Sequence, residues 1–147
     1  MSYTNLPTER EGLLGEICAV AAPAGTYRTA PTWMSMENFH QAKVTLTVGD
    51  MAATSTLDMA LLQAQDANGT GSKALKAITQ LTAAGGDEHD IDYINLRTEE
   101  MDVQNLFTHI CVRVRVGTAA VCFSVIAEGR IPRAAPVDTS RATEIIA

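Results

Sequence analysis

The sequence has few of the residues that usually build a catalytic or nucleic-acid-binding centre. Aromatic residues make up 5% of the 147 residues, with a single tryptophan, and there are three histidines and three cysteines. Only 11 residues are basic, against 17 acidic ones, and the formal net charge is −6. A surface that binds nucleic acid needs clustered Lys and Arg to neutralise phosphates. We therefore expect no nucleic-acid partner.

Long hydrophobic runs are also missing. No segment approaches the roughly 20 apolar residues that span a bilayer, and the opening stretch MSYTNLPTEREGLLG lacks the apolar core of a signal peptide. We expect no membrane partner and synthesis in the cytoplasm. Cys18, Cys111 and Cys122 are odd in number and lack CxxC spacing, which favours free thiols over a disulfide framework or a zinc site. A Cys111–Cys122 bridge is the minor alternative if their strands pair.

Short alternating runs separated by polar turns fill most of the chain. With 46% hydrophobic and 19% charged residues, the composition is that of one globular domain. Alternation is clearest in 42–48 and in 106–116, where Val and Ile alternate with polar residues. The spacing predicts an all-β fold, an antiparallel β-sandwich of jelly-roll type. The expected strands are 16–22, 42–48, 56–65, 72–81, 91–97, 106–116 and 120–127.

The clearest turn lies within 56–81. Two strand-length runs flank the loop DANGTG (66–71), whose Asp, Asn and Gly residues favour tight turns and positive φ. The loop resembles the start of a calcium-binding pattern but lacks its third acidic ligand and closing glutamate. We predict a β-hairpin whose turn holds no metal. A second hairpin is predicted for 106–116 and 120–127, with the latter strand central in its sheet.

Three regions differ in character. We predict an N-terminal arm over 1–15, a β-sandwich domain over 16–127 and an extended C-terminal arm over 128–147. The loop-rich stretch 26–41 contains the single tryptophan, Trp33, and is expected to pack inward. The C-terminal arm contains Gly, Pro and two adjacent isoleucines, which suggests docking onto its own domain or a neighbouring subunit. The candidate interface residues are Arg113, Arg115, Arg130, Ile131, Arg133, Ile145 and Ile146.

No residue cluster has the pattern of an active or metal site. Asp87 to Asp90 are consecutive, and consecutive side chains of an extended chain point apart. His109 and Cys111 share one strand face, but nothing supplies an orienting third group or an oxyanion hole. We expect no enzymatic activity, no catalytic residues, no metal and no cofactor. A hydrolase that uses His109 and Cys111 is the weakest alternative.

The order of two segments is the most specific feature. They are TLDMALLQAQDANGTGSKALKAITQL and, after a glycine-rich loop, INLRTEEMDVQNLFTHICVRVRVGTAA, followed by a closing strand. This pattern, over about 33–127, resembles small virion proteins of tailed bacteriophages. The resemblance implies a structural virion protein made in the host cytoplasm, and within that set we favour a capsid decoration (cement) protein on the capsid surface.

Such a role implies the major capsid protein and further copies of the chain, as a trimer or dimer, as partners. Two alternatives stay open. One is a head–tail or tail component. The other is a carbohydrate- or receptor-binding β-sandwich at the virion surface, with Trp33, Tyr27 and Phe39 as a sugar platform.

Overall fold

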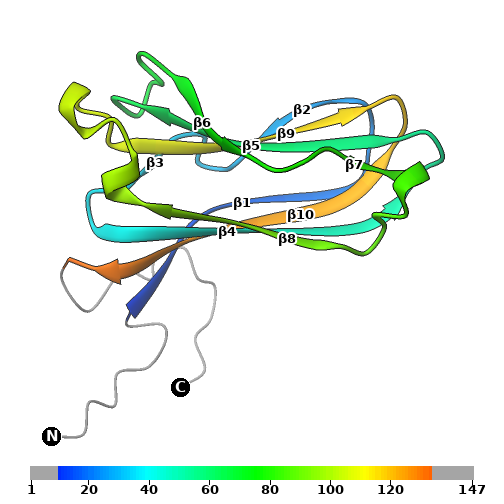
Figure 1. Ribbon diagram of the computed structural model, residues 1–147, viewed down its shortest axis with the longest axis horizontal. Helices are drawn as coiled ribbons and strands as arrows, with labels where there is room; N and C mark the ends of the chain where they lie inside the picture. Colours follow the sequence, from blue (N-terminus) through cyan, green and yellow to red (C-terminus); the bar gives the residue numbers. More distant parts are fainter. Residues whose placement is uncertain (1–9, 134–147) are drawn as a thin grey trace, which may run out of the picture.

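A computed structural model of the chain describes residues 10–133, which form ten β-strands and three short 3₁₀-helices (Figure 1). Among these residues no helix is long and apolar enough to cross a membrane. The strands are β1 (Glu11–Ala22), β2 (Gly25–Arg28), β3 (Met34–Ser35), β4 (Phe39–Met51), β5 (Thr56–Ala64), β6 (Lys73–Ala77), β7 (Leu81–Thr82), β8 (Ile91–Arg97), β9 (His109–Gly117) and β10 (Val121–Pro132). The 3₁₀-helices are η1 (Ala83–Gly85), η2 (Thr98–Glu100) and η3 (Val103–Asn105).

The strands form two antiparallel sheets packed face to face. The first sheet has the order β1-β10-β4-β8. The second has the order β2-β9-β5-β6, with β3 paired to β9 and β7 paired to β5. The chain crosses repeatedly between the layers, and Figure 1 shows the two layers stacked. This is the connectivity of a jelly roll, so the predicted all-β antiparallel sandwich is confirmed.

The core lies between the two sheets and follows the predicted alternation. Val44, Leu46 and Val48 of β4 are buried, as expected from the pattern in 42–48. On the opposing sheet, the inward faces of β5 and β9 meet them. The buried residues of those two strands are Leu57, Met59, Leu61, Ile110, Val112, Val114 and Val116. Period-2 patterning therefore identified the buried faces of these strands correctly.

The second predicted hairpin is wrong. β9 pairs with β2, β3 and β5, whereas β10 pairs with β1 and β4, so the two strands belong to different sheets. The chain crosses between the layers after Gly117, with Thr118 at φ 69°. Two apolar runs around a short turn look the same in sequence whether they pair with each other or belong to different sheets.

β10 is central, as predicted, because it lies between β1 and β4. The Cys111–Cys122 bridge is excluded too, since both cysteines are free thiols.

Two neighbouring strands of the first sheet, β1 and β10, are longer than the sequence predicted. β1 begins at Glu11 rather than at 16, and β10 continues to Pro132 rather than ending at 127. Glu11 is the register partner of Arg130, and their side chains form an ion pair. The described parts of the two predicted arms are therefore largely strand. The remainder of each arm, 1–9 and 134–147, lies outside the described residues.

The stretch 26–41 contains more strand than expected. β2 and β3 pair with β9 and extend the second sheet. Met34, Met36 and Phe39 are buried, and Trp33 is half-buried. The segment packs inward, as predicted, and carries the chain from the second sheet to the first.

Candidate interaction surfaces at the hairpin end

The β5–β6 turn is stabilised by its own aspartate. Asp66 Oδ1 accepts hydrogen bonds from the backbone N–H groups of Asn68 (2.9 Å) and Thr70 (3.0 Å). Its Oδ2 accepts from the Thr70 hydroxyl at 2.6 Å. These bonds lower the pKa of Asp66, and the bond from the Thr70 hydroxyl has the largest effect. The carboxylate serves the loop itself, which agrees with the predicted turn.

This turn meets residues 98–108 at one end of the sandwich, which we call the hairpin end. Gln63 Oε1 accepts from the Asp102 N–H at 2.9 Å, and Gln65 Nε2 donates to the Asn105 carbonyl at 2.9 Å. The Thr108 hydroxyl donates to the Gln65 carbonyl at 3.1 Å. The two segments that carry the phage resemblance are therefore joined in space.

Asp102 is the centre of this junction. Its carboxylate forms an ion pair with Lys73 and accepts 2.9 Å bonds from the Asn105 side chain. The Lys73 hydrogen bond, followed by that of Asn105, lowers the pKa of Asp102. The Lys73 ammonium also lies 4.4 Å from the centre of the Phe107 ring, within cation–π range.

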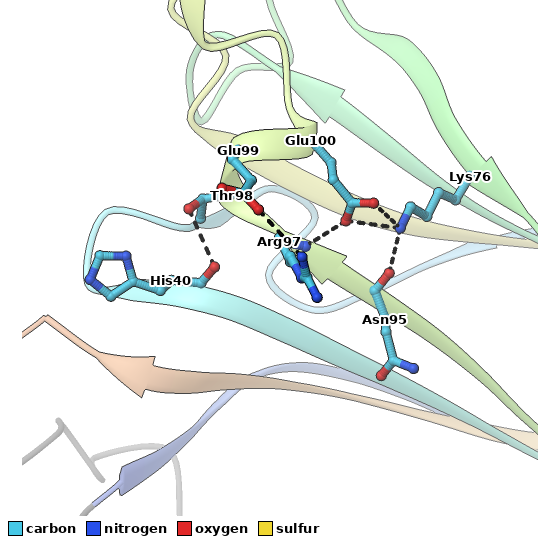
Figure 2. Close-up of polar contacts among 7 residues, drawn as sticks. All are labelled: His40, Lys76, Asn95, Arg97, Thr98, Glu99 and Glu100. Carbon is cyan, nitrogen blue, oxygen red and sulfur yellow. Dashed lines mark hydrogen bonds and ion pairs between the residues drawn. The ribbon is translucent and has the colours of Figure 1, made fainter.

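A second bridge joins the two sheets along the side of the sandwich (Figure 2). Lys76 of β6 donates to the Asn95 carbonyl (2.7 Å) of β8 and to both carboxylate oxygens of Glu100 (2.9 Å). Glu100 also accepts from the Arg97 N–H at 2.7 Å. Glu100 is the last residue of η2 and Thr98 is its first, and the Thr98 hydroxyl donates to the His40 carbonyl at 3.3 Å.

An apolar cavity opens at the hairpin end. We call it the end pocket; its volume is about 260 Å³. Its walls come from the loop between β3 and β4, from 98–108 and from the residue that follows β10. The lining residues are Met36, Glu37, Thr98, Met101, Val103, Phe107, Thr108 and Arg133. The sequence analysis missed this pocket because its apolar lining residues come from two segments, 36–37 and 98–108, that are far apart in the chain and share no periodicity.

A second, polar cleft of about 340 Å³ lies beside it along the edge of the first sheet. Four basic side chains line it, and Glu100 is the single acidic one among its lining residues. The basic residues are Lys43, Lys76, Arg97 and Arg130. Arg130 and Lys76 already contact Glu11 and Glu100, so much of this charge is neutralised within the chain.

The structure separates the predicted interface residues into distinct places. Arg113 and Arg115 project from the outer face of the second sheet, where Asp58 is the register partner of Arg115. Neither arginine forms an ion pair within residues 10–133. Arg130 lines the polar cleft, Ile131 is exposed near the end of β10, and Arg133 lines the end pocket. Ile145 and Ile146 lie outside the described residues.

The outer face of the first sheet carries exposed apolar residues that the sequence analysis did not single out. Ile126 of β10 and Tyr93 of β8 share one row of the sheet, with Thr45 between them. Ile91 of β8 and Val20 of β1 are also exposed. Alternation assigns these residues to the solvent side, but only the sheet order shows that they share one face.

The residues considered above for catalysis or metal binding, namely His109, Cys111 and the loop 87–90, do not form a reactive site in the structure. Cys111 is fully buried, and burial raises the pKa of its thiol, which works against a reactive thiolate. His109 Nδ1 lies 2.9 Å from the Thr108 hydroxyl. In the loop 87–90, Asp87 accepts from the Thr82 N–H at 2.8 Å. Within residues 10–133 no group of three or more His, Cys, Asp or Glu is placed to hold a metal ion.

The described chain is thus a jelly-roll domain with an apolar end pocket. No protein-family model and no curated protein matches its sequence. It is similar to a chain of the broad bean stain virus particle, with 8% identity, 94% of each chain covered and a TM-score of 0.49. It is also similar to VP2 of an infectious bursal disease virus subviral particle, with 12% identity and a TM-score of 0.45.

The VP2 match covers 84% of this chain and 33% of that one, so this chain spans about a third of VP2. A carbohydrate-binding module, CBM28, specific for non-crystalline cellulose is similar as well, with 8% identity, 84% and 73% of the two chains covered and a TM-score of 0.42. At these identities and TM-scores, the likenesses describe the course of the chain and carry no argument about its function.

Proposed function

We propose that this protein is a non-enzymatic structural component of a tailed-phage virion that decorates and stabilises the capsid. The observation that carries the proposal is the phage resemblance over about 33–127. Its two most specific segments are joined by the Gln63–Asp102 and Gln65–Asn105 hydrogen bonds. Residues that form one framework are the part of a structural protein that its relatives are expected to share.

The proposed role needs binding surfaces rather than chemistry, and the domain offers several. Its partners are the major capsid protein and further copies of itself, as a trimer or dimer. Arg113 and Arg115 on one sheet, and Tyr93 and Ile126 on the other, face outward from opposite layers. An exposed sheet face offers a surface for contact with a shell, and many weak contacts on a symmetric lattice add up to stable attachment.

The carbohydrate-binding alternative draws less support. Phe39 is buried between the sheets, and Tyr27 packs edge-on against Phe123 with ring centres 5.6 Å apart. Trp33 is half-buried against Gly69. A sugar platform needs coplanar exposed rings, and these three aromatic residues do not form one.

A cryo-EM map of the particle that contains this protein tests the proposal. We expect density for the sandwich on the outer capsid surface, repeated with the capsid lattice. Particles stripped of the protein should disassemble at a lower temperature than complete particles. Density confined to the neck or tail would replace decoration with the head–tail alternative. Particles with no density for the protein would reject a virion role.

A further inference from the structure

The end pocket has the chemistry of a site for a short aliphatic segment. Met36, Met101 and Phe107 are buried apolar residues of its walls, and methionine side chains adapt to irregular ligands. Val103 lines the pocket yet is 58% exposed. An open cavity of about 260 Å³ is large enough for one or two aliphatic side chains.

The sequence beyond the described residues contains a suitable ligand. Residues 134–147 follow directly on Arg133, which lines the pocket, and include Ile145 and Ile146. The Arg133 N–H donates to the Asn38 carbonyl at 2.9 Å, which holds the last described residue beside the pocket. From Arg133 to Ile145 an extended chain reaches about 40 Å, far enough to meet another copy.

A second copy is the better donor. The segment of a neighbouring copy links two subunits as it binds, which is the self-association that the proposed decoration role needs, whereas a segment bound in its own pocket links nothing. Binding within the same chain is the other outcome of the test. Glu144 precedes the isoleucines, and the lining of the receiving pocket contains one cation, Arg133, with which Glu144 can pair, and one acid, Glu37, which it must avoid.

We propose that the end pocket of each subunit receives Ile145 and Ile146 of a second copy of this chain. This inference rests on the proposed function, because it supplies the self-association that a decoration protein needs. Burial of aliphatic side chains provides the affinity, and the tethered segment provides the link between subunits.

The test uses two full-length variants. The first variant combines Ile145→Ser with Ile146→Ser and removes the two aliphatic side chains that would enter the pocket. The second, Val103→Asp, places a charge in the wall of the receiving pocket at a residue that is itself exposed. Native mass spectrometry and light scattering should show that each variant has a subunit dissociation constant raised about a hundredfold or more. Circular dichroism should show both variants folded. Leu106→Asp is the matched control, since Leu106 is 74% exposed but does not line the pocket, and it should associate like the unchanged protein.

Mixing the two variants identifies the donor. A donor-deficient subunit still has an intact pocket, and a receptor-deficient subunit still has its isoleucines, so a one-to-one mixture should form heterodimers. Failure of the mixture to associate would show that the segment acts within its own chain and would overturn the proposal. So would a Val103→Asp variant that associates as well as Leu106→Asp, or an unchanged protein that stays monomeric.

These outcomes are separate from those of the particle map. A protein that lies on the capsid but associates normally with Val103→Asp keeps the proposed function and loses this inference. A protein that exchanges its C-terminal segment but is absent from the capsid loses the proposed function alone.

Discussion

Trp33 lies directly against Gly69. A Cβ atom on Gly69 would lie 2.5 Å from Trp33 Nε1 and 2.7 Å from Cε2, closer than any side chain tolerates. The tryptophan belongs to the stretch before β3 and the glycine to the β5–β6 turn, so this contact attaches the hairpin to the opposite edge of the second sheet. Gly69 also has φ 84°, the left-handed region that favours glycine.

The variant Gly69→Ala should therefore be strongly destabilised. The methyl group must displace the indole ring and must also adopt the left-handed backbone. We expect a loss of about 2–4 kcal/mol in the free energy of unfolding, measured by urea denaturation. Trp33 fluorescence should shift as well, because the ring loses its contact.

Gly86→Ala separates the two causes. Gly86 has φ 80°, but an added Cβ would meet nothing within 4 Å. Gly86→Ala should lose only the cost of the left-handed backbone, about 1–2 kcal/mol in the free energy of unfolding. Equal losses in the two variants would contradict a packing role for Trp33.

The contrast between local and distant relationships explains what the sequence could predict. The alternation in 106–116 identified the inward face of β9, because that information lies within the strand itself, although Cys111 on the other face is buried as well. The pairing of Gln63 with Asp102, and the contact of Trp33 with Gly69, join segments far apart in the chain and leave no local pattern. Sheet membership is distant information too, and for this reason the predicted pairing of 106–116 with 120–127 was wrong.

Gln63 should be a buried structural polar residue. It is 4% exposed, and its Oε1 accepts the hydrogen bond of the Asp102 N–H. Gln63→Leu leaves that N–H without its partner and should cost about 1–3 kcal/mol in the free energy of unfolding. Gln65→Leu is the control: Gln65 is exposed, water can replace its bond to Asn105, and the loss should stay below about 0.5 kcal/mol.

Phe39 should be energetically coupled to Gly129. The Phe39 ring lies over Gly12 and Gly129, and a Cβ on Gly129 would approach Phe39 Cγ to 2.5 Å. Gly129→Ala should cost about 1–3 kcal/mol by overpacking. In a Phe39→Leu background the same change should cost less, and a double-mutant cycle should give a coupling energy of about 0.5–3 kcal/mol.

Gly25 provides the matched position for this cycle. It also lies in a strand, but the atoms nearest to an added Cβ are 3.8 Å away or more. Gly25→Ala should change the free energy of unfolding by less than about 0.5 kcal/mol and should be additive with Phe39→Leu. A coupling at Gly25 as large as that at Gly129 would show that the effect does not come from the ring contact.

Asp92 should make the domain less stable at neutral pH than at acid pH. It lies opposite Leu46, and its Oδ2 is buried without a hydrogen-bond partner among residues 10–133. Burial first, then the charges of Asp90 and Asp87, raise its pKa. A raised pKa contributes stability that is present below the unfolded value of about 3.9 and is lost as the pH rises through the folded value. Asp92→Asn should therefore raise the melting temperature at pH 7, with the gain shrinking toward pH 4.

Asp66→Asn should show the opposite dependence. Its carboxylate accepts hydrogen bonds from Thr70 and Asn68, which lower its pKa. A lowered pKa contributes stability that is present above the unfolded value and is lost as the pH falls through the folded value. Asp66→Asn should thus melt at a lower temperature than the unchanged protein at pH 7, and the two curves should converge in acid. Thermal melts of both variants from pH 3 to 8 test the signs together, and parallel curves for Asp92→Asn and the unchanged protein would show that Asp92 is ionised at no cost in the fold.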